Sequence, residues 1–153
     1  MLLPHWDVST PLDIAHAVDR LIHADLQDPF VLNRARLYVL TDENSCFHLL
    51  DDDENPYRLL MRTRHHQPFH AGCLVVTGWC APIDAEASAD DDSLPPSRHP
   101  DRQRVRVSVA ISDLGIATVM RQSSAPHTAQ AVTERGTGDL PDVLESWWSG
   151  TLR

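Results

Sequence analysis

Three histidines and one cysteine stand close together near the middle of the chain, in the order His65, His66, His70 and Cys73. Imidazole nitrogens and thiolate sulfurs are ligands that zinc, copper and nickel prefer in proteins. Pro68 lies between them and would break any helix that gathered these side chains, and the chain has no C-x-x-C or H-E-x-x-H spacing. The cluster is a candidate metal site, beside the simpler interpretation of a polar loop with solvated histidines.

Arginine supplies every basic side chain, because the 13 basic residues include no lysine. Guanidinium groups bind phosphates and carboxylates through paired hydrogen bonds. Arg58 and Arg62 are spaced to share one face of a strand, as are Arg104 and Arg106. If these strands are neighbours, the four side chains would form a ligand-binding patch. Each pair also follows an acidic run, so charge balance on a solvated sheet face explains the same residues.

The adjacent Trp147 and Trp148 form a candidate interface. Neighbouring residues on a helix are about 100° apart, so one ring should pack on the protein's own sheet while the other contacts a second subunit. Tryptophan is enriched at the energetic centres of protein interfaces. The pair therefore predicts a homo-oligomer, with a homodimer as its simplest form.

The sequence lacks the short motifs by which many enzymes are recognised. It contains no G-x-S-x-G nucleophile elbow, no C-x-x-C pair and no glycine-rich phosphate loop. No catalytic residue is therefore assigned, the cofactor is unknown, and the sequence leaves open whether the protein is an enzyme.

The charge of the chain constrains its partners. The net charge is −9, from 13 basic and 22 acidic residues. Nucleic acids and anionic membranes are bound by clustered positive charge, so we expect neither as a partner. A protein with a basic surface is a better match for an acidic chain. No apolar stretch approaches the roughly 20 residues that a membrane-crossing helix needs.

Two features predict a cytoplasmic location. Residues 1–7 contain no basic side chain and no apolar core of the kind found in secretion signals. The three cysteines, Cys46, Cys73 and Cys80, are odd in number, which suits free and mostly buried thiols in a reducing compartment.

Helix signals occur near both ends of the sequence. Thr10 can cap a helix that begins at Pro11, and apolar residues then recur at helical spacing until residues 25–28. A second, shorter helix is predicted after Asp139, with Leu144 and the two tryptophans on its apolar side.

Strands are predicted between the two helices. The clearest is 103–112, where valines alternate with Arg104, Arg106 and small residues, so the valines should face the core and the guanidinium groups the solvent. Short polar turns separate most of these segments, which favours antiparallel pairing. The predicted strands are residues 36–40, 46–50, 57–62, 72–79, 103–112 and 116–121.

Residues 82–101 interrupt this pattern with acidic residues and prolines, and we expect them to form a mobile loop before the last hairpin. The length suits one domain that spans residues 1–153. The predicted fold is of the α+β class, with an antiparallel sheet of about six strands flanked by an N-terminal and a C-terminal helix.

Three hypotheses for the function remain open. The first is a non-enzymatic, self-associating protein-interaction module. The second is a flavin- or nucleotide-binding domain of split-barrel type that uses the arginine-rich sheet face. The third is a metal-binding protein that uses the cluster from His65 to Cys73. The absence of catalytic motifs and the paired tryptophans favour the first.

Overall fold

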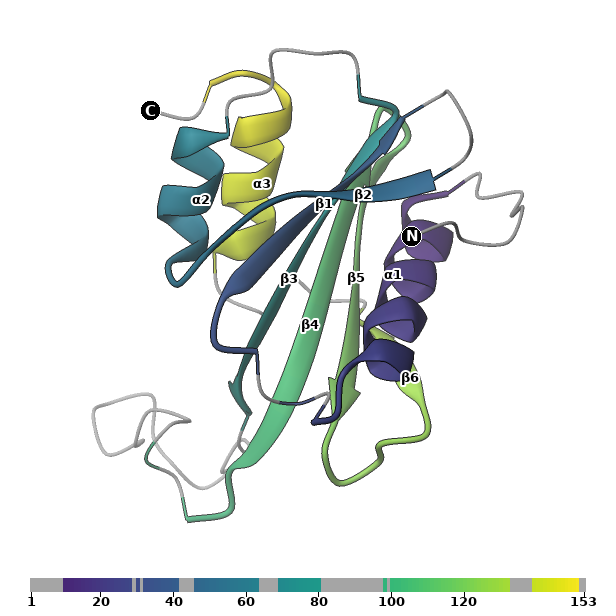
Figure 1. Cartoon of the computed structure of the whole chain (residues 1–153), viewed down its shortest axis with the longest axis vertical. Coiled ribbons are helices and arrows are strands. Elements are labelled where there is room, and N and C mark those ends of the chain that lie inside the picture. Colours follow the sequence, from purple (N-terminus) through teal and green to yellow (C-terminus); the bar gives the residue numbers. More distant parts are fainter. Residues whose placement is uncertain are drawn as a thin grey trace, which may run out of the picture.

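The computed structural model describes residues 10–28, 30, 32–41, 46–63, 69–80, 98, 100–132 and 139–151. Three helices and six strands lie within these ranges (Figure 1). In chain order they are α1 (Pro11–Asp25), β1 (Ala35–Thr41), β2 (Cys46–Asp53), α2 (Pro56–Arg62), β3 (Ala71–Cys80), β4 (Gln103–Ser112), β5 (Gly115–Gln122), β6 (Ala129–Val132) and α3 (Leu140–Trp148).

The six strands form one antiparallel sheet in the order β2-β1-β3-β4-β5-β6. β1 and β2 are a hairpin, and the chain then passes through α2 before β3 pairs with the other side of β1. From β3 to β6 each strand pairs with the next one along the chain. The α+β class and the antiparallel sheet are confirmed.

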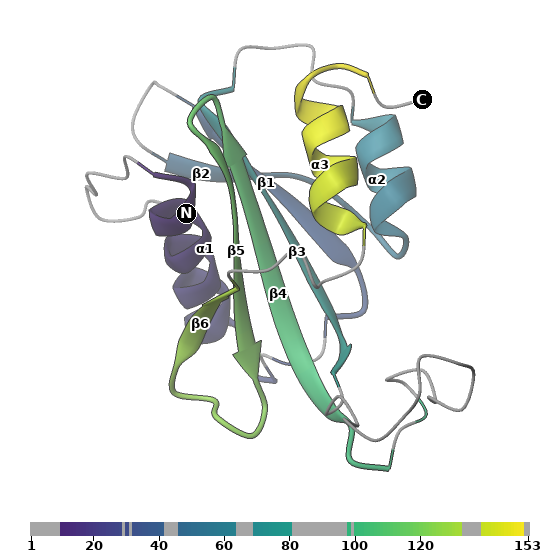
Figure 2. The same ribbon diagram turned by 180° about the vertical axis from the view of Figure 1, so that it is seen from behind.

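Helices cover both faces of this sheet, as two opposite views show (Figures 1 and 2). α1 packs on β4 and β5 on one face, whereas α2 lies over β1 and β2 and α3 over β4 on the other. Each face therefore has its own hydrophobic core. β3 is buried on both sides over residues 71–75 and β4 over residues 105–111, as expected for central strands.

All three helices have a proline in their first turn, where a missing backbone N–H is not needed. The Thr10 hydroxyl accepts a hydrogen bond from the Asp13 N–H at 3.2 Å and caps α1 as predicted. Asn55 caps α2 in the same way, because its side-chain oxygen accepts from the Tyr57 N–H at 2.9 Å and the Arg58 N–H at 3.3 Å.

The strand predicted over residues 57–62 is wrong, because this segment is helix α2. Six residues are too few to separate an alternating pattern from a helical one. As a helix, the segment places the adjacent Leu59 and Leu60 together on the sheet, and both are fully buried. The cap at Asn55 and the proline that follows it start a helix here. β6 was not predicted, so the expected number of strands is right through two compensating errors.

The prediction that Arg106 faces solvent is also wrong. Val105, Val107, Val109 and Ile111 face the core beneath α3, as expected. The opposite face of β4 is covered by α1, so the Arg106 side chain has no exposed surface.

None of the described helices is long and apolar enough to cross a membrane. The loop expected at residues 82–101 lies almost entirely outside the described residues, which here include only 98, 100 and 101.

Candidate functional site

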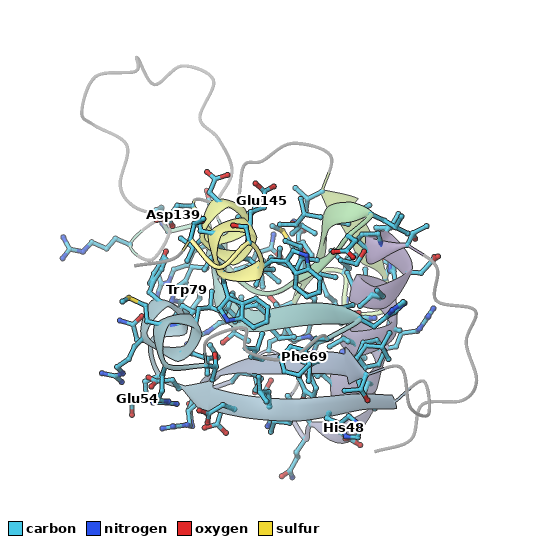
Figure 3. The ribbon with its side chains drawn as sticks, turned by 90° about the horizontal axis from the view of Figure 1, so that it is seen from above. His48, Glu54, Phe69, Trp79, Asp139 and Glu145 are labelled. Carbon is cyan, nitrogen blue, oxygen red and sulfur yellow. The ribbon has the colours of Figure 1, made fainter. Side chains whose placement is uncertain are left out.

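The outer side of β2 is an edge of the sheet. Among the described strands, β2 has β1 as its one neighbour, and β6 at the opposite edge is only half as long. The side chains of Leu49 and Leu50 on β2 are 47% and 40% exposed. Figure 3 shows His48 and Glu54, which lie near the two ends of this strand, along one border of the molecule. We call residues Cys46–Asp53 with this outer side the β2 edge.

A β-bulge interrupts the β2 edge at Leu50. Leu37 of β1 is opposite Asp51 and Tyr38 is opposite Leu49, so Leu50 is an extra residue with no counterpart. The extra residue reverses the alternation of side chains beyond it. Asp51 therefore faces the α2 side of the sheet, as His48 does before the bulge.

The reversal brings Asp53 beneath helix α2, where two arginines bind it. Asp53 is almost completely buried, yet its carboxylate lies 2.6 Å from Arg58 Nη2 and 2.6 Å from Arg62 Nη1. It also accepts a hydrogen bond from the Asn55 N–H at 2.9 Å. The carboxylate thus joins the end of β2 to both turns of α2.

The aspartates on either side complete a balanced set of charges. Arg62 is 2.9 Å from the carboxylate of Asp51, and Arg34 is 2.7 Å from that of Asp52. The three consecutive carboxylates of β2 are therefore matched by three guanidinium groups. In a chain of net charge −9, the surface around β2 and α2 is locally close to neutral.

Asp53→Asn is expected to lower the midpoint of thermal unfolding at pH 7. This destabilisation should diminish in acid. The hydrogen bonds from Arg58, and then that from the Asn55 N–H, hold the pKa of Asp53 well below its usual range. A depressed carboxyl pKa stabilises the fold above about pH 4 and ceases to do so as the pH falls toward the folded pKa. Thermal unfolding of both proteins between pH 7 and pH 2.5 measures the gap, which should narrow steadily as the pH falls below about 4. Glu54→Gln is the matched control, and a gap that widens in acid would contradict this account.

Helix α2 adds two more exposed side chains to this end of the molecule. Tyr57 and Met61 are one helical turn apart and are 39% and 46% exposed. The Tyr57 hydroxyl donates to the carboxylate of Asp139 at the start of α3, and this bond raises the pKa of Tyr57. α2 is thus joined to α3 on one flank and to β2 on the other.

A second cluster of charges lies beneath α1. Arg106 of β4 and Arg121 of β5 are directly opposite one another on the sheet. Arg106 Nη2 lies 2.7 Å from one carboxylate oxygen of Asp19, and Arg121 Nη2 lies 2.7 Å from the other. Arg106 also donates to the Asp19 carbonyl at 3.0 Å, and Arg121 to the Pro126 carbonyl at 2.7 Å. Both oxygens of the carboxylate are engaged, so this cluster fastens α1 to the sheet.

His23 follows Asp19 by one helical turn and borders the same cluster. Burial lowers the pKa of His23, and the positive charges of Arg121 and Arg106 lower it further. The imidazole is therefore held in its neutral form, since a third positive charge beside two arginines is unfavourable.

The four arginines proposed as a ligand patch do not come together. Arg58 and Arg62 lie on α2, whereas Arg106 lies beneath α1 on the opposite face of the sheet. Arg104 shares the face of Arg106 but stacks on Trp79, with its guanidinium carbon 4.0 Å from the ring centroid. The two pairs are on different faces because residues 57–62 are a helix and not a strand of this sheet.

The candidate metal cluster is only partly described. His65 and His66 lie outside the described residues. His70 is exposed at the start of β3, whereas Cys73 is completely buried on the face that α1 covers, and burial raises the pKa of its thiol. Within the described ranges, no group of three His, Cys, Asp or Glu side chains is placed to hold a metal ion.

The two tryptophans occupy different environments. Trp147 is 1% exposed, packs against Gly72 of β3, and donates from its indole nitrogen to the Thr63 carbonyl at 3.0 Å. Trp148 is half-buried and donates to the Asp113 carboxylate at 3.3 Å. A second subunit could therefore reach Trp148 but not Trp147.

Sequence reasoning missed Asp19, Arg121 and the two exposed leucines. A signal for Asp19 was present, because it occupies the apolar stripe of α1 together with Ala15, Val18 and Ile22. An acidic residue in such a stripe is rarely buried without a partner. The exposure of Leu49 and Leu50 could not be predicted from the sequence, since an apolar strand residue is expected to be buried.

No family model, curated protein or solved structure matches this chain. Its function therefore has to be inferred from its own residues.

Proposed function

We propose that this protein is a non-enzymatic protein-interaction module that self-associates as a homodimer. The observation that carries the proposal is the placement of the exposed apolar side chains. Of the six large ones in the described residues, four lie between Leu49 and Met61, on β2 and α2. α2 packs against β2, so the four side chains lie in one region of the molecule, and grouped exposed apolar side chains are typical of protein contact sites.

The distribution of charge supports a second copy as the partner. Two chains of net charge −9 repel one another over most of their surfaces. Around β2 and α2, the aspartates at 51–53 are offset by Arg34, Arg58 and Arg62. These ion pairs reduce the repulsion between two copies that approach through this region.

The arginines also favour an interaction module over a ligand-binding domain. Arg58 and Arg62 are bound to Asp53, and Arg106 is enclosed with Asp19. These guanidinium groups stabilise the fold, which leaves fewer of them for a cofactor phosphate. The proposal also includes a cytoplasmic location and, because the chain is acidic, a second partner with a basic surface.

Light scattering coupled to size exclusion tests self-association directly. The chain has a mass of 17.1 kDa, and the weight-average mass should rise toward twice this value as the concentration increases from about 1 µM to about 500 µM. A mass that stays at that of one chain over the whole range would refute the homodimer. A Trp148→Ala variant measured beside the wild type shows whether that ring contributes.

A further inference from the structure

We propose that two copies of this chain meet edge to edge through β2, in antiparallel pairing about a two-fold axis that passes between Leu49 and Leu50. This inference rests on the proposed homodimer and specifies its surface. It would join the two six-stranded sheets into one continuous sheet.

The backbone of β2 provides the first reason. A strand at the edge of a sheet presents N–H and C=O groups that can pair with another strand. β2 has eight residues and β6 at the other edge has four, so β2 offers the longer pairing surface among the described strands. The strand contains no proline, lysine or arginine between Cys46 and Asp53, and its protection against edge pairing is confined to the bulge at Leu50 and the three aspartates that follow it.

The exposed leucines provide the second reason. Leu49 faces the side of the sheet that α1 covers, but α1 packs mainly on β4 and β5, and the Leu49 side chain is left 47% exposed. Leu50 is displaced from the regular pairing by the bulge. The two side chains are therefore exposed at the middle of the edge, where a two-fold axis would bring four leucines together.

The order of residues along β2 sets the direction of pairing. The first half of the strand carries His48 and no carboxylate, whereas the second half carries Asp51, Asp52 and Asp53. Parallel pairing in register would place aspartates beside aspartates, which is unfavourable. Antiparallel pairing places each acidic half beside the non-acidic half of the other copy.

The bulge is compatible with the proposed register. Because of the extra residue, His48 and Asp51 face the same side of the sheet, the side that carries α2. Residues that are opposite one another in a pair of strands must face the same side. An axis between Leu49 and Leu50 satisfies this condition, because His48 of each copy is then opposite Asp51 of the other.

The same bulge limits the strength of the dimer. Only residues 46–49 and 51–53 are regular strand, so the continuous hydrogen-bonded contact is short. Interfaces that bury less than about 1,200 Å² are commonly transient. We therefore expect a dissociation constant of about 1–100 µM, within reach of analytical ultracentrifugation.

The surface is tested by substituting its central leucine. Leu50→Arg adds two like charges at the axis and should raise the dissociation constant at least about tenfold. Leu114→Arg is the matched control, because Leu114 is 74% exposed in the β4–β5 turn, and it should leave the constant unchanged. Circular dichroism confirms that both variants fold.

The outcomes separate this surface from the proposed function. A wild type that stays monomeric overturns both. A wild-type dimer that tolerates Leu50→Arg but dissociates in Trp148→Ala overturns the surface and leaves the homodimer standing. A dimer that tolerates both Leu50→Arg and Trp148→Ala also overturns the surface and leaves the homodimer standing. Loss of dimerisation in Leu50→Arg alone supports the β2 edge.

Cysteine cross-linking tests the direction of pairing. The variants His48→Cys and Asp51→Cys are mixed and oxidised, and one of them carries a tag that changes its mass. The wild type is oxidised in parallel as the control, because it carries the same native thiols. Antiparallel pairing predicts a cross-linked dimer of one variant with the other, and no cross-linking above the wild-type level in either alone. Cross-linking of each variant with itself would indicate parallel pairing and overturn the proposed register.

Discussion

Replacement of Asp19 by asparagine is expected to destabilise the fold by about 3–5 kcal/mol, the typical cost of removing one partner from a buried ion pair. Asp19 and Arg106 have no exposed surface, and Arg121 is 6% exposed. Without the carboxylate, two guanidinium groups that are opposite one another on β4 and β5 would share a closed space and lose the negative charge that now binds both of them. The loss is large against the roughly 5–15 kcal/mol that stabilises a domain of this kind.

Denaturant unfolding followed by circular dichroism measures this loss. Asp25→Asn is the matched control, since Asp25 is an exposed aspartate on the same helix, and it should change stability by no more than about 0.5 kcal/mol. Replacement of Asp19, Arg106 and Arg121 together by apolar residues should recover much of the loss, because it removes the stranded charges. Equal effects of Asp19→Asn and Asp25→Asn would show that the cluster does not hold α1.

Trp147→Ala is expected to cost about 3–5 kcal/mol, as is usual for truncation of a buried aromatic side chain. The Trp147 ring lies between α3 and β3, and a methyl group added at Gly72 would lie 3.0 Å from it. Its removal would open a cavity in the core beneath α2 and α3. It would also leave the Thr63 carbonyl without its indole donor, which weakens the link between α3 and the end of α2.

Trp148→Ala is the natural comparison, because it removes the same side chain from the next position. Trp148 is half-buried and its hydrogen bond to Asp113 is exposed, so we expect a cost of about 1–2 kcal/mol. Thermal and denaturant unfolding of both variants gives the difference. A Trp148→Ala protein as unstable as Trp147→Ala would mean that both rings serve the same core.

The fold was predictable wherever a local pattern has one physical meaning. The alternation of Val105, Val107 and Val109 is incompatible with a helix, and Thr10 followed by Pro11 is a strong helix start. The error at 57–62 arose because alternation over six residues also fits a strand, and Asn55 and Pro56 were interpreted as part of a turn. Asn55 and Pro56 repeat the arrangement of Thr10 and Pro11, and this recurrence was the better guide.

The sites were less predictable, because they depend on which elements lie over one another. Arg106 occupies a position that the alternation assigns to solvent, and only the docking of α1 makes it a core residue. Asp53 lies beyond the predicted strand 46–50, but the strand continues and the bulge at Leu50 directs Asp53 under α2. Neither the position of a helix over a sheet nor an inserted strand residue can be recognised in one sequence without its structure.

The partners of Asp19 have a consequence for the order in which this protein folds. They follow it by 87 and 102 residues, so α1 cannot bury its carboxylate until both strands have been synthesised. At ribosomal rates of about 5–20 residues per second, that interval is about 5–20 seconds. During translation the first helix must therefore wait for the last third of the chain before it can pack on β4 and β5. Contacts this distant in sequence also slow refolding, and we expect α1 to be the last element to gain protection from hydrogen exchange.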